Sequence, residues 1–146
     1  MNAPSAVKAV LDANILARFI LTPSGFSTPL LVAIESGEVD LVTSEAILAE
    51  VTDVLGRRRV QRYKKLTKEE IDEAVEALRG VAQIVPGLYE IDAVSTDPKD
   101  NPILACALEG AAKYVVTDDR KDLLPMKHYH RIQIVSVPDF LKILKR

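Results

Sequence analysis

The stretch AVKAVLDAN, from Ala6 to Asn14, decides how the rest of the chain is interpreted. It is a short apolar run with two valines that ends in Asp12 and the turn-forming Asn14. This pattern predicts a buried strand followed by a turn. Asp12 is therefore expected at the carboxyl end of a strand.

Outward from this strand, segments with strand and helix patterns alternate along the chain. Short apolar runs predict strands at residues 40–43, 81–85, 114–117 and 132–137. Helical spacing predicts helices at residues 28–37 and 103–112, after the capping residues Ser44 and Thr67, and at the C-terminus from Phe140. Alternation of this kind predicts an α/β fold, a three-layer α/β/α sandwich with a mainly parallel central sheet. A single domain is expected to span residues 1–146.

Composition excludes several classes of protein. Of the 146 residues, 48% are hydrophobic and 27% charged, and no apolar run approaches the ~20 residues of a membrane span. The N-terminus lacks the pattern of a signal peptide, so we expect a cytoplasmic protein. The single cysteine, Cys106, cannot form an internal disulfide and is interpreted as a small core residue. A net charge of −2 argues against binding nucleic acid by global attraction, although a local basic patch would suffice.

Carboxylates fall at several positions where a ligand site is expected. Ligands of open parallel sheets bind outside the carboxyl ends of the strands, which is where Asp12 and the pair Asp118–Asp119 follow their strands. Glu50 interrupts the apolar side of its helix, and Asp100 begins a helix. One such residue alone is commonly a cap or a turn former. The combination favours a shared acidic site.

Converging carboxylates repel one another, and a divalent cation relieves this repulsion. All-oxygen ligands favour Mg²⁺ or Mn²⁺ over zinc. Such an ion lowers the pKa of an attacking water and offsets charge on a phosphodiester. The chain has no Gly-x-Ser-x-Gly elbow, Walker loop or Gly-rich dinucleotide turn. Metal-dependent phosphoryl hydrolysis is therefore the chemistry that fits best.

The sequence around these carboxylates resembles the PIN-domain family, specifically its small prokaryotic branch of VapC-like toxins of toxin–antitoxin pairs. The resemblance covers nearly the whole chain. VLDANIL from Val10 resembles the opening strand, SEAILAEV from Ser44 the second motif, DPKDNPILACA from Asp97 the third, and YVVTDDRKDLL from Tyr114 the fourth.

The resemblance implies roles for individual residues. The catalytic metal ligands would be Asp12, Glu50, Asp100 and Asp119, with Asn14, Ser44, Thr117 and Asp118 in supporting positions. Asp97 is interpreted as a turn or cap residue. The fourth motif departs from the family, because Asp118 replaces a glycine and one extra residue precedes Leu123–Leu124. Asp118 and Asp122 therefore stay open as alternatives to Asp119.

For the whole protein, the resemblance implies a toxin that cleaves single-stranded RNA as an Mg²⁺- or Mn²⁺-dependent endoribonuclease. It also implies a homodimer and often a cognate antitoxin protein as partner. A basic stretch with Tyr63 interleaved suits phosphate contacts and base stacking, the alternative being a solvated helix surface. Its predicted RNA-binding residues are Arg57, Arg58, Arg59, Arg62, Lys64 and Lys65.

Two other functions are compatible with an acidic α/β fold, and the sequence argues against both. A noncatalytic PIN-like module would bind RNA or protein, but it would have no need of four carboxylates. A phosphatase of the kind with Asp after its first strand normally needs a second Asp two residues later, where this chain has Asn14.

Overall fold

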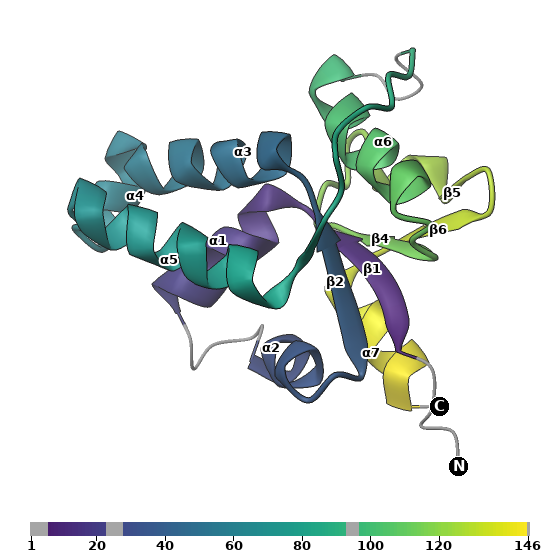
Figure 1. The fold of residues 1–146 in the computed structure, drawn as a ribbon, viewed down its shortest axis with the longest axis horizontal. Coiled ribbons are helices and arrows are strands. Elements are labelled where there is room, and N and C mark those ends of the chain that lie inside the picture. The colour runs from purple at the N-terminus through teal and green to yellow at the C-terminus, as the bar shows by residue number, and fades with distance from the viewer. Residues whose placement is uncertain (1–5, 23–27, 93–96, 146) are drawn as a thin grey trace.

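The strand predicted from Ala6 lies in the middle of the sheet. In the computed structural model, which describes residues 6–22, 28–92 and 97–145, β1 (Val7–Leu11) lies between β2 (Val39–Thr43) and β4 (Tyr114–Val116) (Figure 1). It pairs in parallel with both. Its last three residues are fully buried, as expected for a strand whose two faces are both covered.

The sheet has the strand order β3-β2-β1-β4-β6-β5. The outer strands are β3 (Gln83–Ile84), β6 (Ile132–Val135) and β5 (His128–Tyr129), of which only β5 runs antiparallel to its neighbour. The predicted α/β class with a mainly parallel central sheet is confirmed. The strand predicted at residues 81–85 is shorter than expected. Val81 still belongs to a helix. Only the last two residues of β2, which ends at Thr43, pair with β3.

Helices connect the strands and cover the sheet. Predicted caps begin two of them, since Ser44 accepts from the N–H of Ile47 and Thr67 forms a capping box with Glu70. The helices are α1 (Ala13–Leu21), α2 (Thr28–Glu35), α3 (Glu45–Gly56), α4 (Arg58–Tyr63), α5 (Lys68–Val81), α6 (Asn101–Glu109) and α7 (Val137–Lys145), with 3-10 turns η1 (Pro98–Asp100) and η2 (Leu124–Met126).

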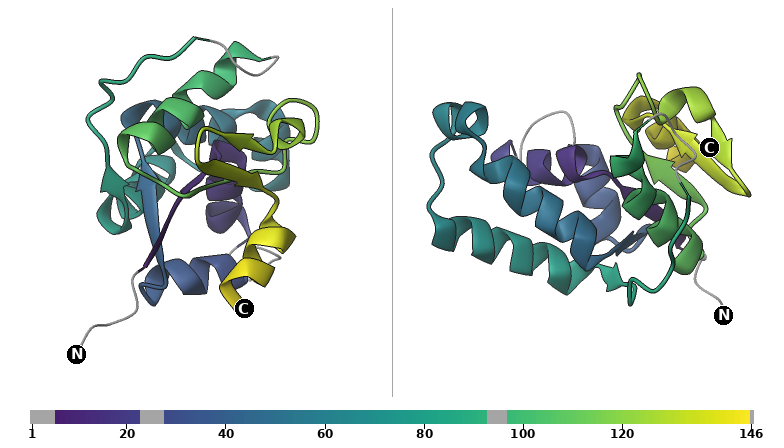
Figure 2. Two further views of the ribbon diagram at one scale, coloured as in Figure 1. Left: turned by 90° about the vertical axis from the view of Figure 1, so that its right-hand side faces the viewer. Right: turned by 90° about the horizontal axis from the view of Figure 1, so that it is seen from above.

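The helices pack in separate groups. Helix α6 packs against β1, β2 and β4, while α2 contacts β2 and α7. Helices α3 and α5 lie side by side and extend away from the sheet, with α4 at their far end (Figures 1 and 2). Within the described ranges, no helix is both long and apolar enough to cross a bilayer.

The strand order creates a switch point between β1 and β4. From β1 the chain proceeds to β2 and β3 on one side, and then returns to β4 and β6 on the other. The carboxyl ends of β1 and β4 therefore lie next to each other, at the position where open α/β sheets bind ligands. Asp12 and Thr117 are the first residues after these two strands.

Candidate metal site

Asp12 sits at the switch point and is held from both sides. It caps α1, because its Oδ1 accepts from the N–H of Ile15 at 2.9 Å. Its Oδ2 accepts from the hydroxyl of Thr117 at 2.5 Å. Asp12 is only 6% exposed and Thr117 is fully buried. The hydrogen bonds from Ile15 and Thr117 therefore hold this carboxylate in one orientation at the end of β1.

Burial raises the pKa of Asp12 above its ordinary value, and the nearby Asp118 carboxylate raises it further. The hydrogen bonds from Thr117 and Ile15 act in the opposite direction, although desolvation is the largest cause. An ionised Asp12 thus carries a charge that the fold only partly stabilises. A cation beside it would offset this cost.

A compact group of carboxylates lies near the start of α6. Asp97, Asp100 and Asp122 each offer an oxygen atom, and these atoms all lie within 4.8 Å of one another. Oxygens on opposite sides of an octahedral Mg²⁺ are about 4.2 Å apart, so small side-chain adjustments would let the three share one ion. Asp97 also accepts from the N–H of Lys99 at 3.0 Å and caps η1, which agrees with its interpretation as a cap.

Asp119 lies outside the compact group, and its hydrogen bonds are to a turn of the backbone. Its Oδ1 accepts from the backbone N–H groups of Lys121 and Asp122, both at 3.0 Å. Its own N–H donates to the Thr117 hydroxyl at 3.0 Å. Asp119 thus shapes the turn that carries Asp122 into the compact group, while Asp118 pairs with Arg18 at 2.5 Å.

Glu50 does not lie on the apolar side of α3, so that part of the sequence reasoning is wrong. Its side chain is 51% exposed, while the buried face of the helix consists of other residues. Position 50 falls at the edge of the apolar stripe and faces a cavity instead of the core. There Glu50 accepts from Arg57 at 3.1 Å, and the same Arg57 nitrogen bonds Asp53 at 3.1 Å.

Most of these carboxylates surround one cavity of about 760 Å³, which we call the acidic cavity, although Asp122 is not among its described lining residues. Asp12, Glu50, Asp100 and Asp119 all line it, as do the predicted supporting residues Asn14 and Asp118. Ser44 lines a neighbouring cavity instead. The lining residues of the acidic cavity are Asp12, Ala13, Asn14, Arg18, Ala46, Ile47, Glu50, Asp53, Arg57, Asp97, Lys99, Asp100, Pro102, Ile103, Asp118, Asp119 and Leu123.

Sequence reasoning missed several of these groups. Arg18, Asp53 and Lys99 line the acidic cavity without having been predicted. Arg18 follows Asn14 by four residues on α1, a spacing that places both on one helix face, so this signal was available once Asn14 was assigned to the site.

The predicted RNA-binding residues divide into two groups. Arg57 lines the acidic cavity itself. The other five lie on or directly after α4, are exposed, and extend from the far end of α3 (Figure 1). They are Arg58, Arg59, Arg62, Lys64 and Lys65.

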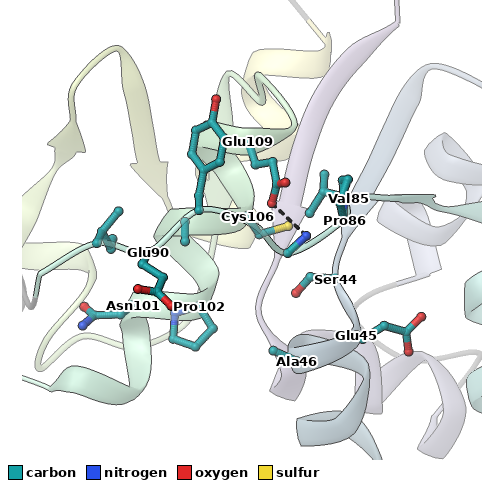
Figure 3. A pocket seen from close by; sticks show the side chains of 14 residues that line it. Ser44, Glu45, Ala46, Val85, Pro86, Glu90, Asn101, Pro102, Cys106 and Glu109 are labelled. Carbon is teal, nitrogen blue, oxygen red and sulfur yellow. Dashed lines mark hydrogen bonds between the residues drawn. The ribbon is translucent and has the colours of Figure 1, made fainter.

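A second cavity of about 550 Å³ lies beside the acidic one, between α3, α6 and residues 85–91 (Figure 3). Cys106 lines it and is buried, as predicted. Burial raises the pKa of its thiol to about 12, although a hydrogen bond with Ser44 acts against this. Such a thiol stays protonated at neutral pH and is no candidate nucleophile.

Fold and site together define an α/β protein whose parallel sheet gathers carboxylates at its switch point. The chain belongs to the PIN domain family, whose model matches residues 8–121. The predicted family is thereby confirmed.

Solved structures share this fold. One is the crystal structure of VapBC2 from Rickettsia felis bound to a DNA fragment from their promoter, with 16% identity and a TM-score of 0.56 over 89% of this chain and 98% of that one. Another is PAE2754 from Pyrobaculum aerophilum, with 14% identity and a TM-score of 0.57 over 97% and 92% of the two chains. At these identities the matches establish the fold alone. None of the curated proteins compared matches the chain in sequence.

Proposed function

We propose that this protein is an Mg²⁺- or Mn²⁺-dependent endoribonuclease that cleaves phosphodiester bonds of single-stranded RNA. One observation carries the proposal: Asp12, Glu50, Asp100 and Asp119, which come from four separate segments of the chain, line a single cavity at the switch point of the sheet. Membership of the PIN domain family, whose members are typically nucleases, supports the same function.

The donor set suits a hard divalent cation. Asp97, Asp100 and Asp122 would hold one ion. Asp12, which lines the acidic cavity together with Asp97 and Asp100, would be the further ligand that most needs a counter-charge. Asp119 would act as a ligand or through the turn it forms, and Glu50 would join after release from Arg57. A bound ion supplies an acidified water and stabilises charge on the phosphodiester.

Cationic side chains at the rim would guide the substrate. Arg18, Arg57 and Lys99 line the acidic cavity, and the exposed residues of α4 continue the positive charge away from it. We propose that Arg57 and the α4 residues contact RNA phosphates. Removing Arg58 and Arg59 together should then weaken RNA binding and reduce its salt dependence, whereas a merely solvated helix would leave both unchanged.

We further propose that the protein is a cytoplasmic toxin of a toxin–antitoxin pair, binds a cognate antitoxin protein and forms a homodimer. The fold shared with the chain solved as VapBC2 supports this role. Co-expression with the product of a short neighbouring reading frame should restore growth and give a stable complex. Light scattering of the purified chain should give the mass of a dimer.

The nuclease proposal is tested with purified protein, single-stranded RNA, and Mn²⁺, Mg²⁺ or EDTA. Cleavage should require the metal and be lost in Asp12→Asn, where the asparagine oxygen can still cap α1. Asp72→Asn is the matched control, because Asp72 is exposed on α5 and lines neither cavity. Binding of RNA without any metal-dependent cleavage would instead favour the noncatalytic module, and hydrolysis of phosphomonoesters alone would favour a phosphatase.

A further inference from the structure

The second cavity opens next to the acidic one, and two of the residues that the structure describes line both. Ala46, in the first turn of α3, and Pro102, in the first turn of α6, belong to the two linings at once. Both are exposed and neither carries a charge. A polymer bound with one phosphate in the acidic cavity would therefore place its neighbouring unit within reach of the second cavity.

The charged side chains that line the second cavity are all carboxylates, which accept hydrogen bonds. Its lining, taken from the described ranges, contains no Lys, Arg or His. It does contain three glutamates, two of which are already engaged. Glu45 pairs with Arg79, and Glu109 accepts from the backbone N–H groups of Gly87 and Leu88 at 3.0–3.2 Å.

Glu90 is the glutamate that stays available. Among the described residues it makes no hydrogen bond or ion pair, and Figure 3 shows it with Asn101 and Pro102 on one side of the cavity, opposite Ser44 and Ala46. Asn101 adds a second acceptor, because its amide oxygen is buried and has no hydrogen-bond partner within the described part of the chain. Such a cavity would repel a phosphate but satisfy an uncharged group that carries N–H donors.

The remaining walls suit a flat ring. Tyr89 lines the cavity as a residue that is 53% exposed, and Pro86, Ile91 and Pro102 contribute apolar surface. Proteins that read single-stranded RNA typically stack its bases on aromatic side chains and bond their Watson–Crick edges. The volume of about 550 Å³ lies within the usual range of small-molecule sites.

We propose that the second cavity is a base-reading subsite that holds a guanine of the RNA next to the cleaved phosphate. Guanine fits best because its Watson–Crick edge presents two adjacent N–H donors, from N1 and the 2-amino group, which match the two oxygens of the Glu90 carboxylate. The Watson–Crick edge of uracil has one N–H donor. The edges of adenine and cytosine each have one amino group, with no second N–H donor beside it. This inference rests on the proposed ribonuclease function.

The direct test uses short oligouridines that carry one guanine, adenine, inosine or 7-deazaguanine. Wild-type protein should cleave at a fixed distance from guanine, with kcat/KM about tenfold above the adenine substrate, because adenine lacks the paired donors for the carboxylate. Inosine, which lacks the 2-amino group, should lose most of this preference. 7-Deazaguanine, whose Watson–Crick edge is intact, should retain it. Equal cleavage of all four substrates would overturn the inference.

Variants assign the preference to the cavity. Glu90→Gln should raise KM for the guanine substrate and bring its kcat/KM close to that of the adenine substrate. Tyr89→Leu should weaken binding while Tyr89→Phe, which retains the ring, should not. Glu73→Gln makes the same change of charge on an exposed residue of α5 and should preserve the guanine preference. A preference that survives Glu90→Gln unchanged would contradict the assignment.

Guanosine alone separates this inference from the proposed function. Without metal, the nucleoside should shift the backbone amide signals of Ser44, Ala46 and Ala105 in the wild type, but not in Glu90→Gln. Uridine should shift them far less. If no RNA is cleaved but guanosine binds in this way, the nuclease proposal fails and the cavity assignment stands. If RNA is cleaved and guanosine causes no shifts, the cavity assignment fails alone.

Discussion

The two cavities lie side by side at one edge of the sheet, yet their linings differ sharply. Among the described residues, the acidic cavity brings together seven carboxylates and three cationic side chains, whereas the second cavity has mostly apolar walls and one unengaged glutamate. The first carries a cost in folding, since it buries Asp12 beside Asp118. On the functions proposed above, the acidic cavity would be the reacting centre, and the second cavity would be the neighbouring surface that selects the base.

The largest effect on RNA cleavage should come from a change at Asp100 in the acidic cavity. Asp100 is 7% exposed and is the member shared by the predicted site and the compact group. Asp100→Asn should lower metal-dependent cleavage at least about a thousandfold, because a bound ion contributes several kcal/mol to the transition state. Steady-state kinetics with Mn²⁺ measures this. A loss of less than about tenfold would remove Asp100 from the reacting centre.

A smaller effect should distinguish Asp122 from Asp119. Asp122→Asn removes a carboxylate oxygen from the compact group and should lower Mn²⁺ affinity more than about tenfold. Asn in place of Asp119 can still accept from Lys121 and Asp122, so it should cost less. Calorimetric titration gives both affinities. The opposite order would make Asp119 the ligand, as the family motif implies.

Ala46, which lines both cavities, offers a way to test how the two cavities cooperate. Ala46→Leu places bulk between them and should lower kcat/KM for RNA about tenfold without changing Mn²⁺ affinity, because Ala46 offers no metal ligand. Ala49→Leu is the matched control, since Ala49 is also exposed on α3 but lines neither cavity. Equal losses of kcat/KM in the two variants would show that the position of Ala46 between the cavities has no special role.

The smallest effect concerns stability and pH. Because the pKa of Asp12 is raised in the folded protein, ionised Asp12 destabilises it. This cost in stability is absent at a pH below the unfolded-state pKa of 3.8, and it is complete at a pH above the raised pKa of the folded state. In the absence of metal, Asp12→Asn should therefore raise Tm at neutral pH, by about 2–4 °C for each kcal/mol recovered.

Thermal melts between pH 3.5 and pH 7.5 measure the difference between the wild type and Asp12→Asn. It should shrink towards the acidic end, and Mn²⁺ should reverse its sign at neutral pH by stabilising the wild type. An Asp12→Asn variant that is less stable at neutral pH without metal would contradict the electrostatic account.

The sequence was sufficient where local patterns govern the structure. The buried run before Asp12 and the caps Ser44 and Thr67 predicted β1, α3 and α5, because short-range hydrogen bonds and burial determine them. The placement of Asp12 at the sheet edge followed from this strand and the parallel topology.

Other features depend on long-range contacts or exact turn geometry. Glu50 lies outside the buried face of α3 because one helical step separates that face from the cavity face. Asp122 reaches Asp97 and Asp100 only through the turn that Asp119 forms, and Arg18 meets Asp118 across the fold. The second cavity includes residues 85–91, an irregular segment without a periodic pattern, held by Glu109.

Mn²⁺ binding tests the central claim most directly, because it requires neither an RNA nor a partner. Calorimetric titration of the purified wild type should give saturable binding that EDTA reverses. Asp100→Asn should abolish it, and Asp72→Asn should leave it unchanged. Saturable binding of equal strength in the wild type and Asp100→Asn, or none in the wild type, would contradict the account of a metal site at the switch point of the sheet.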